Sequence, residues 1–148
     1  MRVITFNANG IRSAASKGFF VWLGAQQADV VCVQETRARI DQLNDGHFFP
    51  DGYHCYYFDA ERPGYAGTAV YTRREPQTVV RGLGWEPIDS EGRWLQVNFA
   101  GISVVSLYMP SGSSGEERQA RKIELMDKLM PHLKALRRKR REFILCAD

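Results

Sequence analysis

The chain has 148 residues, of which 44% are apolar and 25% are charged, and its net charge is +3. This is the composition of an ordinary globular domain, and it excludes a disordered, collagen-like or disulfide-stapled chain. No apolar run approaches the roughly 18–20 residues that span a bilayer, so the sequence predicts no transmembrane segment. The N-terminus lacks the features of a secretory signal, and three cysteines without a Cys-x-x-Cys pair fit free thiols in a reducing cytoplasm.

Apolar runs and their periodicity predict the elements along the chain. A strand over 3–6 is followed by an amphipathic helix over about 13–26, whose middle is weakened by Gly18 because glycine costs about 1 kcal/mol inside a helix. The β-branched run over 29–33 is typical of a strand that is covered on both faces. A short helix is expected over 38–43, and further strands over 53–58, 67–71, 78–81, 93–99 and 102–108.

The last third of the chain contains a loop, a long helix and a strand. Residues 110–115 form the loop by composition, and the helix runs over about 116–138. Six apolar side chains follow one face of this helix, and we expect the two methionines among them to lie in the core: Ile123, Met126, Leu129, Met130, Leu133 and Leu136. An apolar strand over 142–146 comes last, and we expect the complete domain to continue beyond it. The order of elements favours a mixed sheet with helices outside.

The basic run over 137–141 carries five positive charges, more than the net charge of +3 of the whole chain. It forms either a solvated turn between helix and strand or a surface that contacts nucleic-acid phosphates. On the second interpretation, Arg137, Arg138 and Arg140 are candidate contacts.

Four polar residues occupy the same kind of position, at or directly after the carboxyl end of a predicted apolar strand: Asn7, Glu35, Tyr108 and Asp148. Active sites of α/β sheets assemble at such strand ends. Glu35 and Asp148 offer hard carboxylate oxygens, which suit Mg²⁺ or Mn²⁺ better than zinc. Asn7 offers a carbonyl to a metal or an amide to a phosphate, while Tyr108 suits a donor to a developing phosphoryl oxygen or a group that helps to activate the nucleophile. The set predicts metal-assisted hydrolysis of a phosphate ester.

Six segments, in chain order, resemble the exonuclease III and AP-endonuclease family within the endonuclease/exonuclease/phosphatase superfamily: TFNANGIRSA, ADVVCVQETRA, YAGTAVYTR, SEGRWLQVNF, SLYMPSGSSG and EFILCAD. The resemblance implies an α/β (α+β) fold, a four-layer αββα sandwich of which residues 1–148 form the N-terminal half. It also implies a cytoplasmic DNA-repair nuclease that depends on Mg²⁺ (or Mn²⁺), cleaves DNA at abasic sites and trims 3′ ends.

The same resemblance implies roles for individual residues. Glu35 is the main Mg²⁺ ligand together with Asn7, Tyr108 is the active-site tyrosine, and Asp148 orients or activates the attacking water. Supporting or nucleic-acid-contacting roles fall to four further residues: Asn9, Gln34, Gly67 and Arg93. The family's later asparagine, aspartate and histidine have no counterpart within residues 1–148, so we expect these residues alone to be catalytically inactive.

A second resemblance suggests an alternative function. The segments PSGSSGEE, RRKRRE and GLGWE resemble the branch that contains the catabolite repression control protein Crc, a regulator with altered catalytic positions. On this alternative the chain is an inactive regulator that acts on RNA or with an RNA-binding protein. The presence of both Glu35 and Asp148 favours the nuclease, because a binding protein has no need for both carboxylates.

Overall fold

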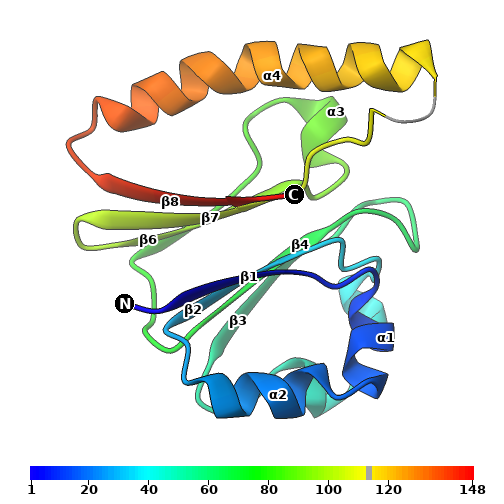
Figure 1. Cartoon of the computed structure of the whole chain (residues 1–148), viewed down its shortest axis with the longest axis vertical. Helices are drawn as coiled ribbons and strands as arrows, with labels where there is room; N and C mark the ends of the chain where they lie inside the picture. Colours follow the sequence, from blue (N-terminus) through cyan, green and yellow to red (C-terminus); the bar gives the residue numbers. More distant parts are fainter. Residues whose placement is uncertain (113–114) are drawn as a thin grey trace.

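The β-branched and aromatic runs of the sequence form two four-stranded sheets that face each other (Figure 1). The structure is a computed structural model, and it describes residues 1–112 and 115–148. The first sheet has the strand order β1-β2-β4-β3, with the bounds β1 Val3–Asn7, β2 Val30–Gln34, β3 His54–Phe58 and β4 Thr68–Thr72. The second has the order β5-β6-β7-β8, with the bounds β5 Thr78–Arg81, β6 Trp94–Phe99, β7 Ile102–Leu107 and β8 Glu142–Ala147.

Helices cover the outer face of each sheet (Figure 1). They are α1 (Ile11–Ser16) and α2 (Phe19–Gln26) on the first sheet, and α3 (Glu86–Asp89) and α4 (Glu116–Arg137) on the second. Two 3₁₀ turns, Ile40–Gln42 and Gly46–Phe48, lie between β2 and β3, where the sequence predicted one short helix. The αββα layering implied by the resemblance is confirmed. The order of elements alone suggested a single mixed sheet. Instead, β5 pairs with β6, β6 with β7 and β7 with β8, and these four strands form a second sheet.

Parallel pairing brings the carboxyl ends of four strands to one end of the sandwich. β1 pairs with β2 in parallel and β7 pairs with β8 in parallel, and in each case helices form the crossover that a parallel pair requires. Every residue of β2 is buried because this strand has neighbours on both sides and packs between the α1–α2 layer and the second sheet. Its continuous β-branched run is the sequence signature of that position.

The helix expected over 13–26 is divided in two at Gly18. Its φ of 93° lies in the left-handed region that favours glycine, so α1 ends before it and α2 starts after it. Phe19 and Leu23 of α2 are buried, and the ring of Phe19 stacks on that of Phe6 at 4.6 Å between centroids. The break allows both short helices to lie against the same sheet.

The core face of α4 differs from the face that the sequence predicted. Leu125, Leu129 and Leu136 are buried against the second sheet, whereas Met126 and Met130 are about half exposed, as is Ile123. The expectation that both methionines lie in the core was therefore wrong. At 3.6 residues per turn, the exposed side chains lie roughly 100–160° around the helix axis from Leu125, so one stripe cannot hold both groups.

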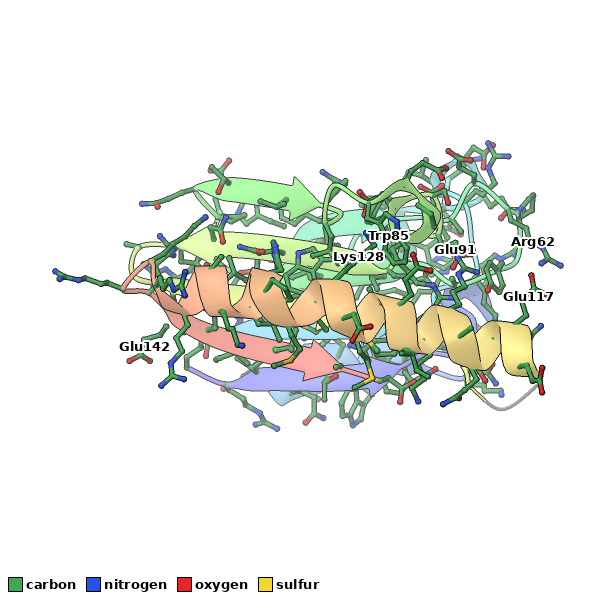
Figure 2. All side chains as sticks on the ribbon, turned by 90° about the horizontal axis from the view of Figure 1, so that it is seen from above. Arg62, Trp85, Glu91, Glu117, Lys128 and Glu142 are labelled. Carbon is green, nitrogen blue, oxygen red and sulfur yellow. The ribbon has the colours of Figure 1, made fainter. Side chains whose placement is uncertain are left out.

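The basic run follows α4 and lies at the opposite end of the second sheet from Glu91, close to Glu142 (Figure 2). Arg141 is used structurally: its guanidinium donates to Ser103 Oγ at 3.2 Å, to the carbonyl of Ile102 at 3.2 Å and to the carbonyl of Phe99. These bonds fix the turn that leads into β8.

Several smaller features agree with the sequence. Cys32 and Cys146 are buried free thiols and Cys55 is a half-buried one. Within the described residues, we find no helix that combines the length and the apolar character needed to cross a membrane. Of the loop predicted over 110–115, residues 113–114 lie outside the described residues.

Two glycines with similar backbone angles provide a test of how closely the loops pack. Gly92 (φ 60°) is buried, and an added Cβ would lie 2.2 Å from the carbonyl oxygen of Phe58 and 2.8 Å from the backbone of Asp59. Gly101 (φ 78°) is exposed and has no atom within 4 Å of the same position. We expect Gly92→Ala to lower the free energy of unfolding by about 2–4 kcal/mol and Gly101→Ala by about 1 kcal/mol. Urea denaturation measures both, and equal losses would contradict the close approach at Gly92.

Candidate active site

The four polar residues predicted from strand ends lie together at one end of the sandwich. Asn7 is the last residue of β1, and Glu35, Tyr108 and Asp148 each directly follow a strand, β2, β7 and β8 respectively. Two buried polar contacts join these strand ends across the sheets. The amide of Gln34 donates to Ser106 Oγ at 3.1 Å, and Ser106 Oγ donates to the carbonyl of Val33 at 2.9 Å.

Asn7 and Asp148 form a direct pair between the two sheets. The Nδ2 of Asn7 donates to Asp148 Oδ2 at 2.6 Å, and its Oδ1 accepts the backbone N–H of Asn9 at 2.8 Å. The backbone of Asp148 is also fixed, because its N–H donates to Leu107 and its carbonyl accepts from Met109 at 2.7 Å. Contacts within the chain therefore orient both side chains. Asn9 lies at the rim, where it holds Asn7 through its backbone.

Glu35 is held in an unusual backbone conformation. Its φ is 59°, in the left-handed region that costs a non-glycine residue about 1–2 kcal/mol, and its carbonyl accepts the N–H of Gly10 at 2.9 Å. The residue is only 9% exposed, and its Oε1 forms an ion pair with the guanidinium of Arg37. Such strain is typical of functional sites.

Gly67 brings the backbone of the β3–β4 loop against this turn. With a φ of 86°, it accepts the N–H of Thr36 at 3.2 Å and donates to the carbonyl of Glu91 at 3.2 Å. An added Cβ would lie 2.3 Å from Thr36 Oγ1, so only glycine fits here. Gly67 thus supports the turn that carries Glu35 and Thr36.

Tyr108 lies beside Glu35 and under the guanidinium of Arg93. Burial raises the pKa of the Tyr108 phenol, and the negative charge of Glu35 raises that pKa further, while Arg93 and Arg37 lower it in part. The guanidinium carbon of Arg93 lies 4.9 Å from the centre of the Tyr108 ring, and its Nη1 donates to the Tyr108 carbonyl at 3.1 Å. A phenol with a raised pKa is neutral at pH 7 and acts as a hydrogen-bond donor.

Arg93 is the buried centre of a charged network. It is 2% exposed, pairs with Glu91 at 2.5 Å and donates to the hydroxyl of Tyr65 at 3.1 Å. The same Glu91 carboxylate pairs with Arg121 of α4, so the long helix is tied to the site through two arginines and one acid. Figure 2 shows Glu91 beside the N-terminal half of α4. The Arg93 guanidinium thus joins Glu91, Tyr65 and the Tyr108 carbonyl.

A hollow of about 520 Å³ opens next to these side chains, lined by Glu35, Arg37, Tyr65, Arg93 and Tyr108 among others. It is bordered by four arginines, one acid and two aromatic rings, a lining that suits an anionic ester with a planar group attached. Arg137, Arg138 and Arg140 are not brought to this hollow, since they belong to the far end of α4 and its following turn.

The donors available to a metal ion are oxygens. Within residues 1–112 and 115–148, no three His, Cys, Asp or Glu side chains meet as a ready-made metal cage. The site instead offers the carboxylates of Glu35 and Asp148 and the amide oxygen of Asn7. Mg²⁺ is often bound through one or two carboxylates and keeps several of its waters, so this donor set fits it.

Four residues of the site were not predicted from the sequence: Arg37, Tyr65, Glu91 and Arg121. Arg37 and Glu91 each lie two positions from a predicted site residue, within the segments ADVVCVQETRA and SEGRWLQVNF that resemble the family, but the sequence alone did not single them out. Tyr65 and Arg121 come from a loop and a helix, and nothing in the local sequence indicates that they reach Arg93.

Comparisons with known proteins agree with this geometry. The family model described as "Endonuclease/Exonuclease/phosphatase family" matches residues 4–148. An exodeoxyribonuclease from Bacillus subtilis is 34% identical over 149 residues, which cover 100% of this chain and 58% of that protein. A DNA-(apurinic or apyrimidinic site) endonuclease from Dictyostelium discoideum is 30% identical over 128 residues, which cover 86% of this chain and 35% of that protein.

Solved structures share the fold. An AP endonuclease from Archaeoglobus fulgidus superposes with a TM-score of 0.85 at 30% identity, over 100% of this chain and 57% of that one. A 3′ phosphatase from Neisseria, solved with a product DNA hairpin, superposes with a TM-score of 0.84 at 22% identity, which shows the fold alone. The chain thus spans little more than half the length of the relatives that it matches end to end.

Two substitutions of charged neighbours should shift the pKa of the Tyr108 phenol in opposite directions. We expect Glu35→Gln to lower the pKa of the Tyr108 phenol, because a negative neighbour is removed, and Arg37→Gln to raise it, because a positive one is removed. NMR titration of ring-labelled tyrosine measures the pKa, with Tyr108→Phe to assign the signal. Asp41→Asn, at an exposed acid on a 3₁₀ turn, is the control and should not move it. A shift in the same direction for both substitutions would contradict the assigned contacts.

Proposed function

Because the chain belongs to the endonuclease/exonuclease/phosphatase family, we propose that it carries the metal- and phosphate-binding part of a Mg²⁺-dependent DNA-repair nuclease, one that cleaves at abasic sites and trims 3′ ends. The observation that carries this proposal is the meeting of Asn7, Glu35, Tyr108 and Asp148 at one end of the sandwich, beside a hollow lined by four arginines. Relatives named as an exodeoxyribonuclease and an abasic-site endonuclease support DNA as the substrate.

Glu35 and Asn7 are the residues that we propose to hold the metal. A Mg²⁺ or Mn²⁺ ion bound there supplies positive charge that stabilises the phosphoryl oxygens as the phosphodiester bond breaks. Glu35 suits the role because its backbone is fixed and its carboxylate faces the hollow. Asn7 suits it because its side chain is held on both sides, by Asn9 and by Asp148.

Asp148 and Tyr108 act on the water and on the phosphate. Asp148 Oδ2 is engaged by Asn7, and no side chain of the described residues engages Oδ1, which is therefore available to orient the attacking water and accept its proton. Tyr108, neutral at pH 7, donates a hydrogen bond to a phosphoryl oxygen. Water adds to phosphorus, the bond from phosphorus to the 3′ oxygen breaks, and that oxygen takes a proton to give a 3′-hydroxyl.

A nucleic-acid contact near the scissile bond is proposed for Asn9, because it adjoins the site. For Arg93, whose guanidinium is buried and bonded to Glu91 and to the Tyr108 carbonyl, we propose that it positions Tyr108 beneath a bound nucleic acid. The run Arg137, Arg138 and Arg140 lies at the other end of the second sheet and would reach only a nucleic acid that extends along its whole length. No observation on this chain favours the alternative of an RNA-associated catabolite repression regulator.

We expect Glu35→Gln in the full-length protein to reduce Mg²⁺-dependent cleavage of a duplex with one abasic site by about a hundredfold or more, the size of effect seen when one transition-state contact is removed. Asp41→Asn, which neutralises an exposed acid that pairs only loosely with Arg39 at 3.8 Å, should leave the rate unchanged. Initial rates at millimolar Mg²⁺ measure both. Undiminished cleavage by Glu35→Gln would reject Glu35 as the metal ligand.

Residues 1–148 alone should show no cleavage above background. A phosphodiester site needs charge stabilisation at the attacking oxygen and at the leaving oxygen. The residues assigned above act on the attacking water and on the phosphoryl oxygens, and none of them is assigned to the leaving oxygen. The measurement compares this chain with the full-length protein on the same fluorescent abasic duplex. Activity in a monomeric preparation of the 148 residues would overturn the proposal that the leaving group is served from outside this chain.

A further inference from the structure

We propose that the Arg37 guanidinium occupies the carboxylate of Glu35 and that a divalent metal ion must displace it in order to bind there. The displaced guanidinium then binds a substrate phosphate. The inference rests on the proposed function, because it assumes that Glu35 is a metal ligand. It starts from the ion pair between Arg37 and Glu35 Oε1, which occupies the carboxylate that the metal would need.

The two partners of this pair are not equally mobile. The side chain of Glu35 is 12% exposed, while that of Arg37 is 48% exposed. The backbone of Glu35 is also fixed, because its carbonyl accepts the N–H of Gly10 at 2.9 Å. When another cation arrives, the half-exposed guanidinium is therefore the partner that leaves. Because the Arg37 side chain is half exposed, water can solvate its guanidinium as it leaves the carboxylate.

The backbone of Arg37 is fixed, so that only its side chain is free to move. Its φ is 50°, its N–H donates to the carbonyl of Ala66 at 2.8 Å, and its carbonyl accepts from the guanidinium of Arg12 at 3.5 Å. Because both backbone groups of Arg37 are hydrogen-bonded, its side chain starts from a fixed position at the edge of the site.

The space around Arg37 shows where the guanidinium can go. Besides the hollow at Glu35, Arg37 lines a second one of about 400 Å³, together with Gly10, Arg12, Ser13 and Gly64. None of these lining residues is acidic, and two are arginines, so the second hollow offers no internal carboxylate to a displaced guanidinium. A phosphate oxygen is the partner that its planar set of donors fits.

This arrangement couples the two ligands. Binding of the cation to Glu35 releases the group that binds phosphate, and binding of phosphate to Arg37 frees the carboxylate for the cation. By linkage each ligand raises the affinity for the other. Arg93 cannot serve the same purpose, because it is buried and already bonded to Glu91 and Tyr65.

The first test measures Mn²⁺ affinity by calorimetry on the full-length protein without DNA. We expect Arg37→Gln to bind Mn²⁺ about two- to fivefold more tightly than the unaltered protein, since the competing cation is gone. Arg37→Lys, which keeps a charge without the planar fork, should fall between them. Arg39→Gln removes an exposed arginine two positions away and should change nothing. Unchanged or weaker Mn²⁺ binding by Arg37→Gln would overturn the proposal.

The second test measures DNA affinity by fluorescence anisotropy with Mn²⁺ present, in an Asp148→Asn background that prevents cleavage. Adding Arg37→Gln should weaken duplex binding and flatten its dependence on salt by about 0.9 in log–log slope, the value for one lost phosphate contact. An unchanged slope would overturn the phosphate role.

The Mn²⁺ affinity of Glu35→Gln separates this inference from the proposed metal ligand. If Glu35→Gln binds Mn²⁺ as well as the unaltered protein does, the assignment of Glu35 as metal ligand fails together with the inference on Arg37. If Glu35→Gln loses Mn²⁺ binding while Arg37→Gln gains none, only the inference on Arg37 fails.

Discussion

The side-chain amide of Gln34 is the contact on which the site depends. It is 1% exposed, lies between the two sheets, and donates to Ser106 Oγ at 3.1 Å and to the carbonyl of Cys146 at 3.4 Å. Facing sheets usually meet through apolar side chains, which allow small shifts, whereas a buried amide requires its partners in place. β2 is thereby locked to β7 and β8, so the residues that follow them, Glu35 and Asp148, are held at the same end of the sandwich.

A second constraint comes from buried charge. Arg93 is almost fully buried, and a buried cation is tolerated only when it is paired and hydrogen-bonded. Its partner Glu91 is shared with Arg121, so the position of α4 and the position of Tyr108 are set by the same acid. Removing one member leaves a buried charge without its partner, which is why α4, although it carries none of the strand-end residues, still shapes the site.

Local sequence patterns predicted the strands and the strand-end residues well, for a physical reason. A continuous β-branched run can be buried only in a central strand, and Asn7, Glu35, Tyr108 and Asp148 then follow from where each run stops. The wider geometry could not be predicted in this way. The division into two sheets, the network around Glu91 and the half-exposed methionines of α4 depend on contacts between distant segments, which the period of one helix or strand does not encode.

The bond between Asn7 and Asp148 joins residues that are 141 positions apart. Closing so long a loop costs entropy that local helices and hairpins do not, so we expect this contact to form late, after both sheets are in place. During synthesis the first strand leaves the ribosome long before its partner does. A growing or partly unfolded chain thus has the Asn7 amide and the Asp148 carboxylate far apart, and the two groups come together only with the finished fold.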